Sequence, residues 1–382
     1  MAVPFMLSSD SHIIEPPDLW TQRIDPDFAE RAPQVRPLDG ADFWFIDGKP
    51  SMSFLGAQTG DRFEKDATEL ITAAKFEDVR SAAYDPRRYL DENRSDGVLG
   101  QVIYPSEALL AFSITDSALC SATMRAYNDF IADFCSEDPS RLKGCGLLNV
   151  DDPQEAAAEL QRIRERGLAG ALITVLPPAD KPYDLAIYQP LWAMACDLDM
   201  PLSMHVATGR QQLSVDPSQE STRRVTEAAF YLQDHFVRKS IGEMIFGGVF
   251  ERHPTLRIGS IEHEVSWAPF FLFQMDYCYT DRPLRGDWIR FKNDALPSSF
   301  FHQNCFVSFQ EDTVGLRVRD VVGVENLLWG SDYPHTESTF PRSRQITADV
   351  LQGVPEKEQR LILRDNTARI YGFDVDALAR LA

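Results

Sequence analysis

Residues 142–175 read LKGCGLLNVDDPQEAAAELQRIRERGLAGALITV, and they combine two kinds of hydrophobic spacing. The continuous apolar runs at the two ends of this stretch are typical of fully buried strands. Between them, Ala156, Leu160 and Ile163 recur at helical spacing within Pro153–Arg166, and the charged residues lie on the opposite side. A strand, a helix and a second strand in this order predict parallel strands joined by a right-handed crossover.

The same alternation extends along the whole chain and gives eight candidate strands. Eight such units predict an α/β fold of the closed (β/α)8 TIM-barrel type, and 382 residues suit a single barrel domain with insertions. The sequence contains no Gly-rich phosphate-binding pattern, which would favour an open nucleotide-binding sheet. The candidate strands are Phe5–Ser9, Val98–Tyr104, Leu142–Val150, Leu168–Val175, Pro201–Val206, Leu256–Ile261, Cys305–Phe309 and Asn326–Trp329.

Two long segments interrupt this alternation. One spans about residues 15–88, after the first strand, and the other spans residues 276–303, after the sixth. Insertions this long in a compact domain act as lids, or they pack on the barrel or on a second subunit. Their many aromatic side chains predict a bulky or ring-containing substrate, because flat apolar walls suit such ligands.

Charge and hydropathy narrow the classes of partner. The chain has 38 Lys and Arg against 58 Asp and Glu, a net charge of −20, which argues against nucleic acid and membrane surfaces as partners. No apolar run is long enough to span a bilayer, and Met1–Ile14 lacks the features of a secretory signal. The six cysteines form no C-x-x-C pair and fit buried free thiols in a reducing compartment. We therefore expect a cytoplasmic protein that acts on a small molecule.

Histidine and carboxylate side chains follow several of the predicted strands. The carboxyl ends of all barrel strands share one face, where active sites are built. Imidazole and carboxylate groups gathered there are what a divalent metal ion needs, and each would be costly to bury alone. These residues are Asp10 and His12 at the first strand, His205 at the fifth, Glu262 and His263 at the sixth, and Asp332 after the eighth.

These motifs together resemble the amidohydrolase-related (amidohydrolase-2) family of the amidohydrolase superfamily. The resemblance is carried by D-x-H at Asp10, by His205, by the Glu262-His263 pair and by WGSDYPH at 329–335, and it extends from Ser8 to about Gly372. Aminocarboxymuconate-semialdehyde decarboxylase and resorcylate-type decarboxylases belong to this group. The resemblance implies a metal-dependent barrel, a homodimer, and a divalent ion held by Asp10, His12, His205 and Asp332.

The sixth strand departs from the pattern of those decarboxylases, in which a histidine ends the strand and acts on the substrate. Here that position falls on Glu262, with His263 next to it. On a strand only one of the two can point inward, and Glu262 is favoured because His263 shares its face with the apolar Ile261. Glu262 would then be a base or a further metal ligand. A ligand set this rich in carboxylates makes Mn or Fe more plausible than Zn, with one or two ions bound.

Three catalytic hypotheses follow. The favoured one is a metal-dependent hydrolase that uses a metal-activated water, with Asp332, Glu262 or His263 handling the proton. His335 would contact substrate or orient a ligand, or would merely occupy a turn. One alternative is a non-oxidative decarboxylase of an aromatic or unsaturated carboxylic acid, and another is an iron-dependent oxygenase. A non-catalytic barrel would lack stoichiometric metal. Decarboxylation also needs a cationic anchor, for which the candidates are Arg80, Arg88, Arg282, Arg285 and Arg290.

Overall fold

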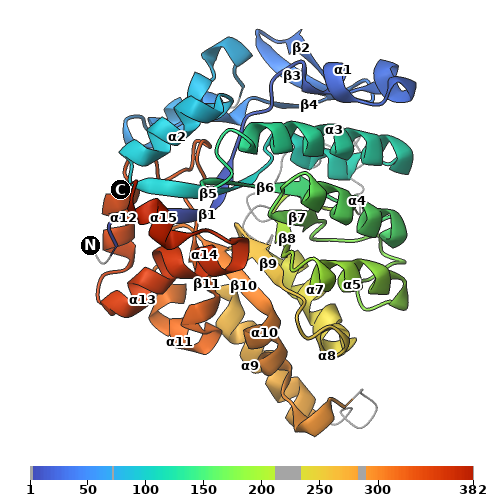
Figure 1. Cartoon of the computed structure of the whole chain (residues 1–382), viewed down its shortest axis with the longest axis vertical. Helices are drawn as coiled ribbons and strands as arrows, with labels where there is room; N and C mark the ends of the chain where they lie inside the picture. Colours follow the sequence, from blue (N-terminus) through green and yellow to red (C-terminus); the bar gives the residue numbers. More distant parts are fainter. Residues whose placement is uncertain (1–2, 71–72, 211–233, 283–289, 382) are drawn as a thin grey trace.

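The computed structural model describes residues 3–70, 73–210, 234–282 and 290–381 and contains an eight-stranded parallel sheet (Figure 1). The strand order is β1-β5-β6-β7-β8-β9-β10-β11, which follows the order along the chain, as in a (β/α)8 barrel. The predicted barrel is therefore confirmed; seven strands lie within their predicted runs, and β1 extends past its predicted run to His12. The strands are β1 (Met6–His12), β5 (Val98–Tyr104), β6 (Leu142–Leu147), β7 (Gly170–Ile173), β8 (Leu202–His205), β9 (Ile258–Ile261), β10 (Cys305–Phe309) and β11 (Leu327–Trp329).

The first and last strands meet through side chains and loops. In the described part of the chain β1 and β11 form no backbone ladder. Instead, the Ser9 hydroxyl donates to the Trp329 carbonyl at 3.0 Å, and the Asp332 N–H donates to the Asp10 carbonyl at 2.9 Å. This seam brings two of the predicted metal ligands together at the carboxyl end of the barrel.

Helices between the strands complete the barrel wall. The helix α4 shows why they form: Asp152 caps its N-terminus by accepting from two backbone N–H groups, Pro153 occupies the first turn, and Leu160 and Ile163 are buried as predicted. Figure 1 shows both chain termini on one side, beside α12 and α15. The principal helices are α2 (Pro86–Ser95), α3 (Ser117–Cys135), α4 (Pro153–Glu165), α5 (Gln189–Asp197), α7 (Asp234–Phe246), α8 (Val249–Arg252), α9 (Trp267–Asp281), α10 (Pro297–Asn304), α11 (Arg319–Val322), α12 (Ser343–Val350), α13 (Glu356–Arg360), α14 (Asn366–Tyr371) and α15 (Val375–Ala379).

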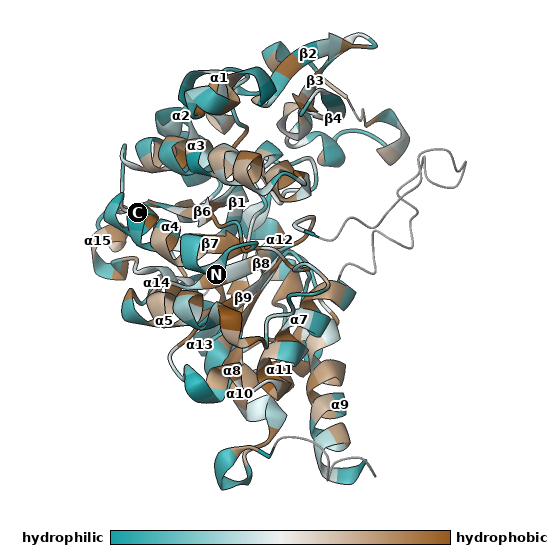
Figure 2. Cartoon of the chain, turned by 90° about the vertical axis from the view of Figure 1, so that its right-hand side faces the viewer, coloured by the Kyte–Doolittle hydropathy of each residue, from teal (hydrophilic) through white to brown (hydrophobic). Residues whose placement is uncertain are grey.

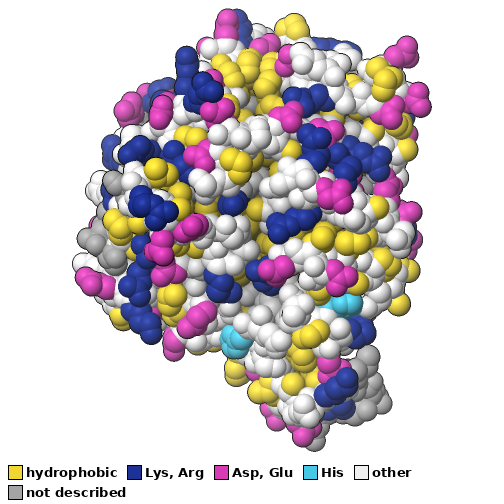
Figure 3. Space-filling model, in the orientation of Figure 1, with side chains coloured by type: hydrophobic (Ala, Val, Ile, Leu, Met, Phe, Trp, Pro, Cys, Tyr) yellow, Lys and Arg dark blue, Asp and Glu magenta, His cyan; other side chains and the backbone are white. Residues whose placement is uncertain are grey.

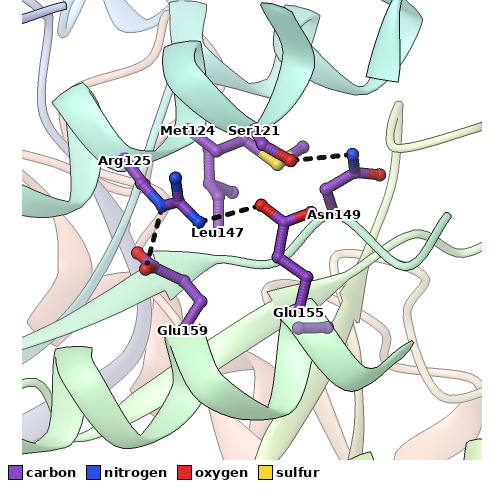
Figure 4. A pocket seen from close by; sticks show the side chains of 8 residues that line it. Ser121, Met124, Arg125, Leu147, Asn149, Glu155 and Glu159 are labelled. Carbon is purple, nitrogen blue, oxygen red and sulfur yellow. Dashed lines mark hydrogen bonds and ion pairs between the residues drawn. The ribbon is translucent and has the colours of Figure 1, made fainter. Parts of the chain in front are cut away.

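Several charged side chains on the outer wall form ion pairs. Acidic and basic residues are interspersed over the face seen in Figure 3. In the small pocket between α3 and α4, Arg125 pairs with Glu155 at 2.8 Å and with Glu159 at 3.4 Å (Figure 4). Because these charges satisfy each other, the pocket is a helix-packing contact.

The first insertion contains its own small sheet. It comprises α1 (Leu19–Arg23), an antiparallel sheet of β2 (Gln34–Leu38), β3 (Ala41–Ile46) and β4 (Lys49–Ser53), and several short 3-10 turns. Trp44 of β3 packs edge-on against Trp20 of α1, with ring centroids 4.8 Å apart, and both are buried. Many of the aromatic residues in this segment therefore form a core that anchors it.

The second insertion is shorter than predicted because helices continue into both of its ends. The helix α9 runs on to Asp281, and α10 already begins at Pro297. Figure 2 shows hydrophobic colouring along α9, where Phe270 and Phe273 are 62% and 61% exposed. Among the described residues, no helix combines the length and apolar character needed to cross a bilayer. All six cysteines are free thiols.

Candidate metal centre

Four side chains from three strand ends converge at the carboxyl face of the barrel. Asp10 and His12 come from β1, His205 ends β8, and Glu262 follows β9. One ligand atom from each lies within 4.8 Å of the others. The Nε2 of His205 is 3.6 Å from Asp10 Oδ1 and 3.2 Å from Glu262 Oε2, and the Nε2 of His12 is 3.4 Å from Asp10 Oδ1. Several groups thus face one point small enough for a single ion.

Asp332 and His335 join the same cluster from the loop after β11. Asp332 Oδ1 lies 3.4 Å from His12 Nε2 and 2.8 Å from His335 Nδ1. His12, Asp332 and His335 form a second group with metal-binding spacing, which shares His12 with the first. The rings of His12 and His335 are stacked with centroids 4.0 Å apart. The structure therefore brings all of these predicted residues together.

The cluster contains buried polar atoms without hydrogen-bond partners, which are costly unless something satisfies them. These atoms are Asp10 Oδ1, His12 Nε2, His205 Nε2 and Asp332 Oδ1. In the described part of the chain none of the four atoms makes a hydrogen bond of good geometry, and their nearest polar neighbours are other members of the cluster, 2.8–3.6 Å away. Nitrogen and carboxylate oxygen atoms are common ligands of divalent metals, so a cation at this point would satisfy all four. The residues therefore fit a divalent metal ion.

Hydrogen bonds on the outer side of two histidines prepare them for such a role. His12 Nδ1 lies 2.7 Å from the Pro105 carbonyl, and His205 Nδ1 lies 3.1 Å from the Val206 carbonyl. Because a carbonyl only accepts, each Nδ1 carries the proton, and each Nε2 turns a lone pair toward the cluster. Burial, followed by the charge of His335, lowers the pKa of His12 and keeps its imidazole neutral, as metal binding requires.

The carboxyl groups of the cluster differ in their pKa. Burial raises the pKa of Asp332 to about 7. Burial, followed by repulsion from Asp332 and Asp10, raises the pKa of Glu262 well above its ordinary value. Burial also raises the pKa of Asp10, but attraction to the neighbouring His12 and His205 outweighs it, so this pKa is lowered. A cation is thus needed to hold the whole set ionised near neutral pH.

Both Glu262 and His263 approach the cluster, so the strand-alternation argument that admitted only one does not apply. β9 ends at Ile261, and Glu262 has a left-handed backbone with a φ of 61°. This turn lets Glu262 reach His205, while the buried His263 places Nδ1 3.2 Å from the Ser260 hydroxyl. Burial, followed by the charge of His205, lowers the pKa of His263 to about 3, and its Nε2 has no partner among the described residues.

The sequence reasoning missed an arginine beside the cluster. Arg62, from the first insertion, pairs with Glu311, and its charge acts to lower the pKa of Asp332. Its position in a long irregular segment gave no pattern by which to select it. Three further residues near the cluster, Glu15, Ser106 and Glu107, were not selected from the sequence either. They come from two segments about 92 residues apart, and no sequence pattern indicates that these segments meet.

The arginines proposed from the sequence as anchors make contacts outside the cluster. Arg80 pairs with Glu92, Arg282 lies over the ring of Tyr277, and Arg290 donates to the Tyr279 carbonyl. Arg88 donates to the Ser81 hydroxyl, and Arg285 lies outside the described residues. Arg62 is thus the better-placed cation in the described part of the chain.

Comparisons with known proteins identify relatives that share this architecture. A "Gamma-resorcylate decarboxylase" from Polaromonas sp. is 23% identical over 295 residues, covering 70% of this chain and 83% of the relative. A "2-amino-3-carboxymuconate-6-semialdehyde decarboxylase" from Dictyostelium discoideum is 23% identical over 316 residues, covering 81% and 82%. The solved structure of a Polaromonas dihydroxybenzoic acid decarboxylase with bound manganese and 2-nitroresorcinol superposes with a TM-score of 0.64 at 18% identity, covering 97% of each chain.

These relatives favour the decarboxylase alternative over the hydrolase that the sequence reasoning preferred, and they give the oxygenase no support. The protein is an enzyme that contains a site for a divalent metal ion. The family described as Amidohydrolase matches residues 105–373, which is more than half of the chain. The match begins after β1, so Asp10 and His12 lie outside the matched residues. The chain belongs to the amidohydrolase-related (amidohydrolase-2) family of the amidohydrolase superfamily.

Proposed function

We propose that this protein is a manganese-dependent, non-oxidative decarboxylase of a hydroxylated aromatic carboxylic acid. The observation that carries the proposal is the buried cluster of unpartnered ligand atoms with Asp332, whose pKa is raised to about 7, at its edge. Relatives named as resorcylate and carboxymuconate-semialdehyde decarboxylases support the reaction class.

Asp10, His12, His205, Glu262 and Asp332 would hold the ion. Their carboxylate-rich composition suits manganese, which the Polaromonas decarboxylase structure contains, better than zinc. When bound, the metal supplies positive charge that polarises a substrate oxygen. The imidazoles contribute neutral Nε2 lone pairs, and the protein supplies the burial that keeps competing water away.

Asp332 is the proposed proton donor. In decarboxylation the bond between the ring carbon and the carboxylate breaks, CO2 leaves, and the ring carbon takes up one proton. Asp332 is buried at the edge of the cluster, where its carboxyl would take up a proton and pass it to the ring carbon. Burial, followed by the charge of His205, lowers the pKa of His335 to about 4, so a neutral His335 lies at Asp332 and orients it. His263 would offer its unpartnered Nε2 to the substrate.

Arg62 is the proposed anchor for the substrate carboxylate. Its charge acts on Asp332 from the first insertion, and its Nε is buried without a hydrogen-bond partner among the described residues. A guanidinium binds a carboxylate through two parallel hydrogen bonds, which fixes the orientation of an aromatic acid.

The test is a substrate panel with the Mn2+-loaded protein. We expect CO2 release from hydroxybenzoic acids such as gamma-resorcylate, and none from the Asp332→Asn variant, while the surface variant Asp91→Asn keeps full activity. Esters, amides and lactones of similar size serve as hydrolase substrates. Hydrolysis of these without CO2 release from any acid would refute the proposal and restore the hydrolase.

We further propose a cytoplasmic homodimer of single-domain subunits. The exposed Phe270 and Phe273 on α9 form an aromatic stripe of a kind found at subunit contacts. Light scattering that shows a monomer would contradict the homodimer. Two separate unfolding transitions would contradict the single-domain subunit.

A further inference from the structure

Two buried glutamates lie behind the candidate metal centre, and the function proposed above does not use them. Glu15 follows β1, and Glu107 is the first residue of the 3-10 helix after β5. Their exposed fractions are 0% and 1%, and each carboxyl accepts a hydrogen bond from the backbone N–H of the other residue. The largest influences on Glu107 are burial, the Glu15 carboxyl and backbone N–H groups, with no cation among them in the described part of the chain.

The two carboxyl groups are not equivalent. Glu15 accepts one backbone N–H bond from Glu107 and one from Ala108, each at 3.0 Å, through separate oxygen atoms. Glu107 accepts one bond, from the Glu15 N–H at 3.3 Å, and its other oxygen has no donor. Two N–H donors suit an ionised Glu15, and an oxygen without a donor suits a protonated Glu107.

Two ionised carboxylates in contact and away from water would repel each other strongly, so such a pair retains one proton. In line with this, burial and then the Glu15 carboxyl raise the pKa of Glu107 well above its ordinary value. Two titratable groups on neighbouring elements interact with Glu15, namely Tyr127 of α3 and His335. Burial raises the pKa of Tyr127 and lowers that of His335 to about 4, so both are neutral near pH 7 and neither offsets a second negative charge.

Residues 105–108, which include the backbone groups bonded to Glu15, directly contact the candidate metal centre. The Pro105 carbonyl accepts the Nδ1–H of His12 at 2.7 Å. The Ser106 hydroxyl lies 2.7 Å from Nε2 of His335, whose Nδ1 contacts Asp332. Glu107, the next residue along the chain, is hydrogen-bonded to Glu15. Glu15 in turn follows His12 by three residues. The contacts to Glu15 and the two histidine contacts therefore all involve one short segment, residues 105–108.

We propose that Glu15 and Glu107 share a single proton and act as positioning residues for the candidate metal centre. The proton lies on Glu107, and the ionised Glu15 fixes residues 105–108 against the segment after β1. This arrangement keeps Nε2 of His12 directed at the ion and holds His335 against Asp332. Any consequence for catalytic turnover rests on the proposed decarboxylase function. The shared proton and the metal affinity do not, because both are measured without substrate.

Isosteric substitutions separate the two roles. Glutamine in Glu107→Gln reproduces a neutral acid that donates to Glu15, so we expect the Mn2+ affinity to equal that of the wild type. In Glu15→Gln the side-chain oxygen can accept only one of the two backbone N–H bonds, and the side-chain NH2 group faces the other N–H donor. We therefore expect the Mn2+ affinity to fall about tenfold or more. The exposed Glu77→Gln variant is the matched control and should change nothing.

Infrared spectroscopy detects the proton itself. A protonated carboxyl has a carbonyl stretching band that shifts in D2O, and at about pH 8 ordinary glutamates do not contribute to it. In the Mn2+-loaded protein we expect this band in the wild type and in Glu77→Gln, and its loss in Glu107→Gln. Circular dichroism confirms that each variant is folded.

Three results would overturn the proposal: a band that persists in Glu107→Gln, a Glu107→Gln protein that loses Mn2+ affinity or does not fold, or a folded Glu15→Gln protein with wild-type affinity. If Glu15→Gln does not fold, the two measurements on Glu107→Gln still decide the matter. If the band and affinities behave as expected but no acid is decarboxylated, the proposed function fails and the acid pair stands.

Discussion

Replacing Asp332 with asparagine should stabilise the metal-free protein while removing its metal-dependent activity. Asp332 is 3% exposed, and burial raises its pKa from 3.8 to about 7. Ionising this carboxyl therefore works against folding when no cation is present. This rise corresponds to about 4 kcal/mol, because each pH unit is worth about 1.36 kcal/mol.

The difference in free energy of unfolding between Asp332→Asn and the wild type depends on pH. An acid whose pKa is raised in the folded state binds more protons when folded, so stability falls as pH rises from about 4 to about 7. Below about pH 4 wild type and Asp332→Asn should have nearly equal free energies of unfolding, because the carboxyl is protonated in both states. Above about pH 7 the variant should be more stable by about 4 kcal/mol.

Urea unfolding of chelator-treated protein at about pH 4 and about pH 8 measures this difference. Added Mn2+ should then stabilise the wild type, and it should not stabilise the variant. Asp91→Asn, an exposed carboxyl on α2, should change the free energy of unfolding by less than about 0.5 kcal/mol at either pH. A variant less stable than wild type at the higher pH, or a difference that does not grow with pH, would refute the reasoning.

Three further predictions concern the ion and the substrate. His205→Ala should purify without stoichiometric metal but retain its circular dichroism spectrum, because it removes a ligand and leaves the barrel wall intact; full occupancy by elemental analysis would show that the ligand assignment is wrong. The Mn2+ affinity measured by calorimetry should weaken as pH falls below about 7, with protons released on binding, because Asp332 must be ionised to bind; an affinity independent of pH would contradict this. Arg62→Gln should raise KM by about tenfold or more with a smaller change in kcat, since it removes a charge-assisted contact to the substrate; an unchanged KM would count against the anchor.

The strands and the convergence of the strand-end residues could be predicted from the sequence because both depend on local pattern. Apolar runs alternating with helical spacing located all eight strands, and barrel topology then placed Asp10, His205 and Asp332 at one face. The positions of Glu262 and His263 could not be predicted in this way. Alternation describes a strand, and a single left-handed residue at Glu262 ends it.

The long-range partners were beyond the reach of sequence patterns for a different reason. Arg62, whose charge acts on Asp332, belongs to a long insertion that no hydrophobic period covers. Glu15 and Glu107 are 92 residues apart, and each resembles an ordinary loop glutamate until the two loops are brought together. The choice between hydrolase and decarboxylase likewise depended on relatives, because one barrel scaffold supports both reactions.

The seam between β1 and β11 has a consequence for biosynthesis. The hydroxyls of Ser8 and Ser331 are 3.1 Å apart although 323 residues separate them along the chain, and the ligands on either side of the seam are equally remote in sequence. A nascent polypeptide therefore cannot assemble the complete ion site until its last strand leaves the ribosome. Loading with metal becomes one of the final steps of maturation, and the ion, once bound, fastens the beginning of the protein to its end.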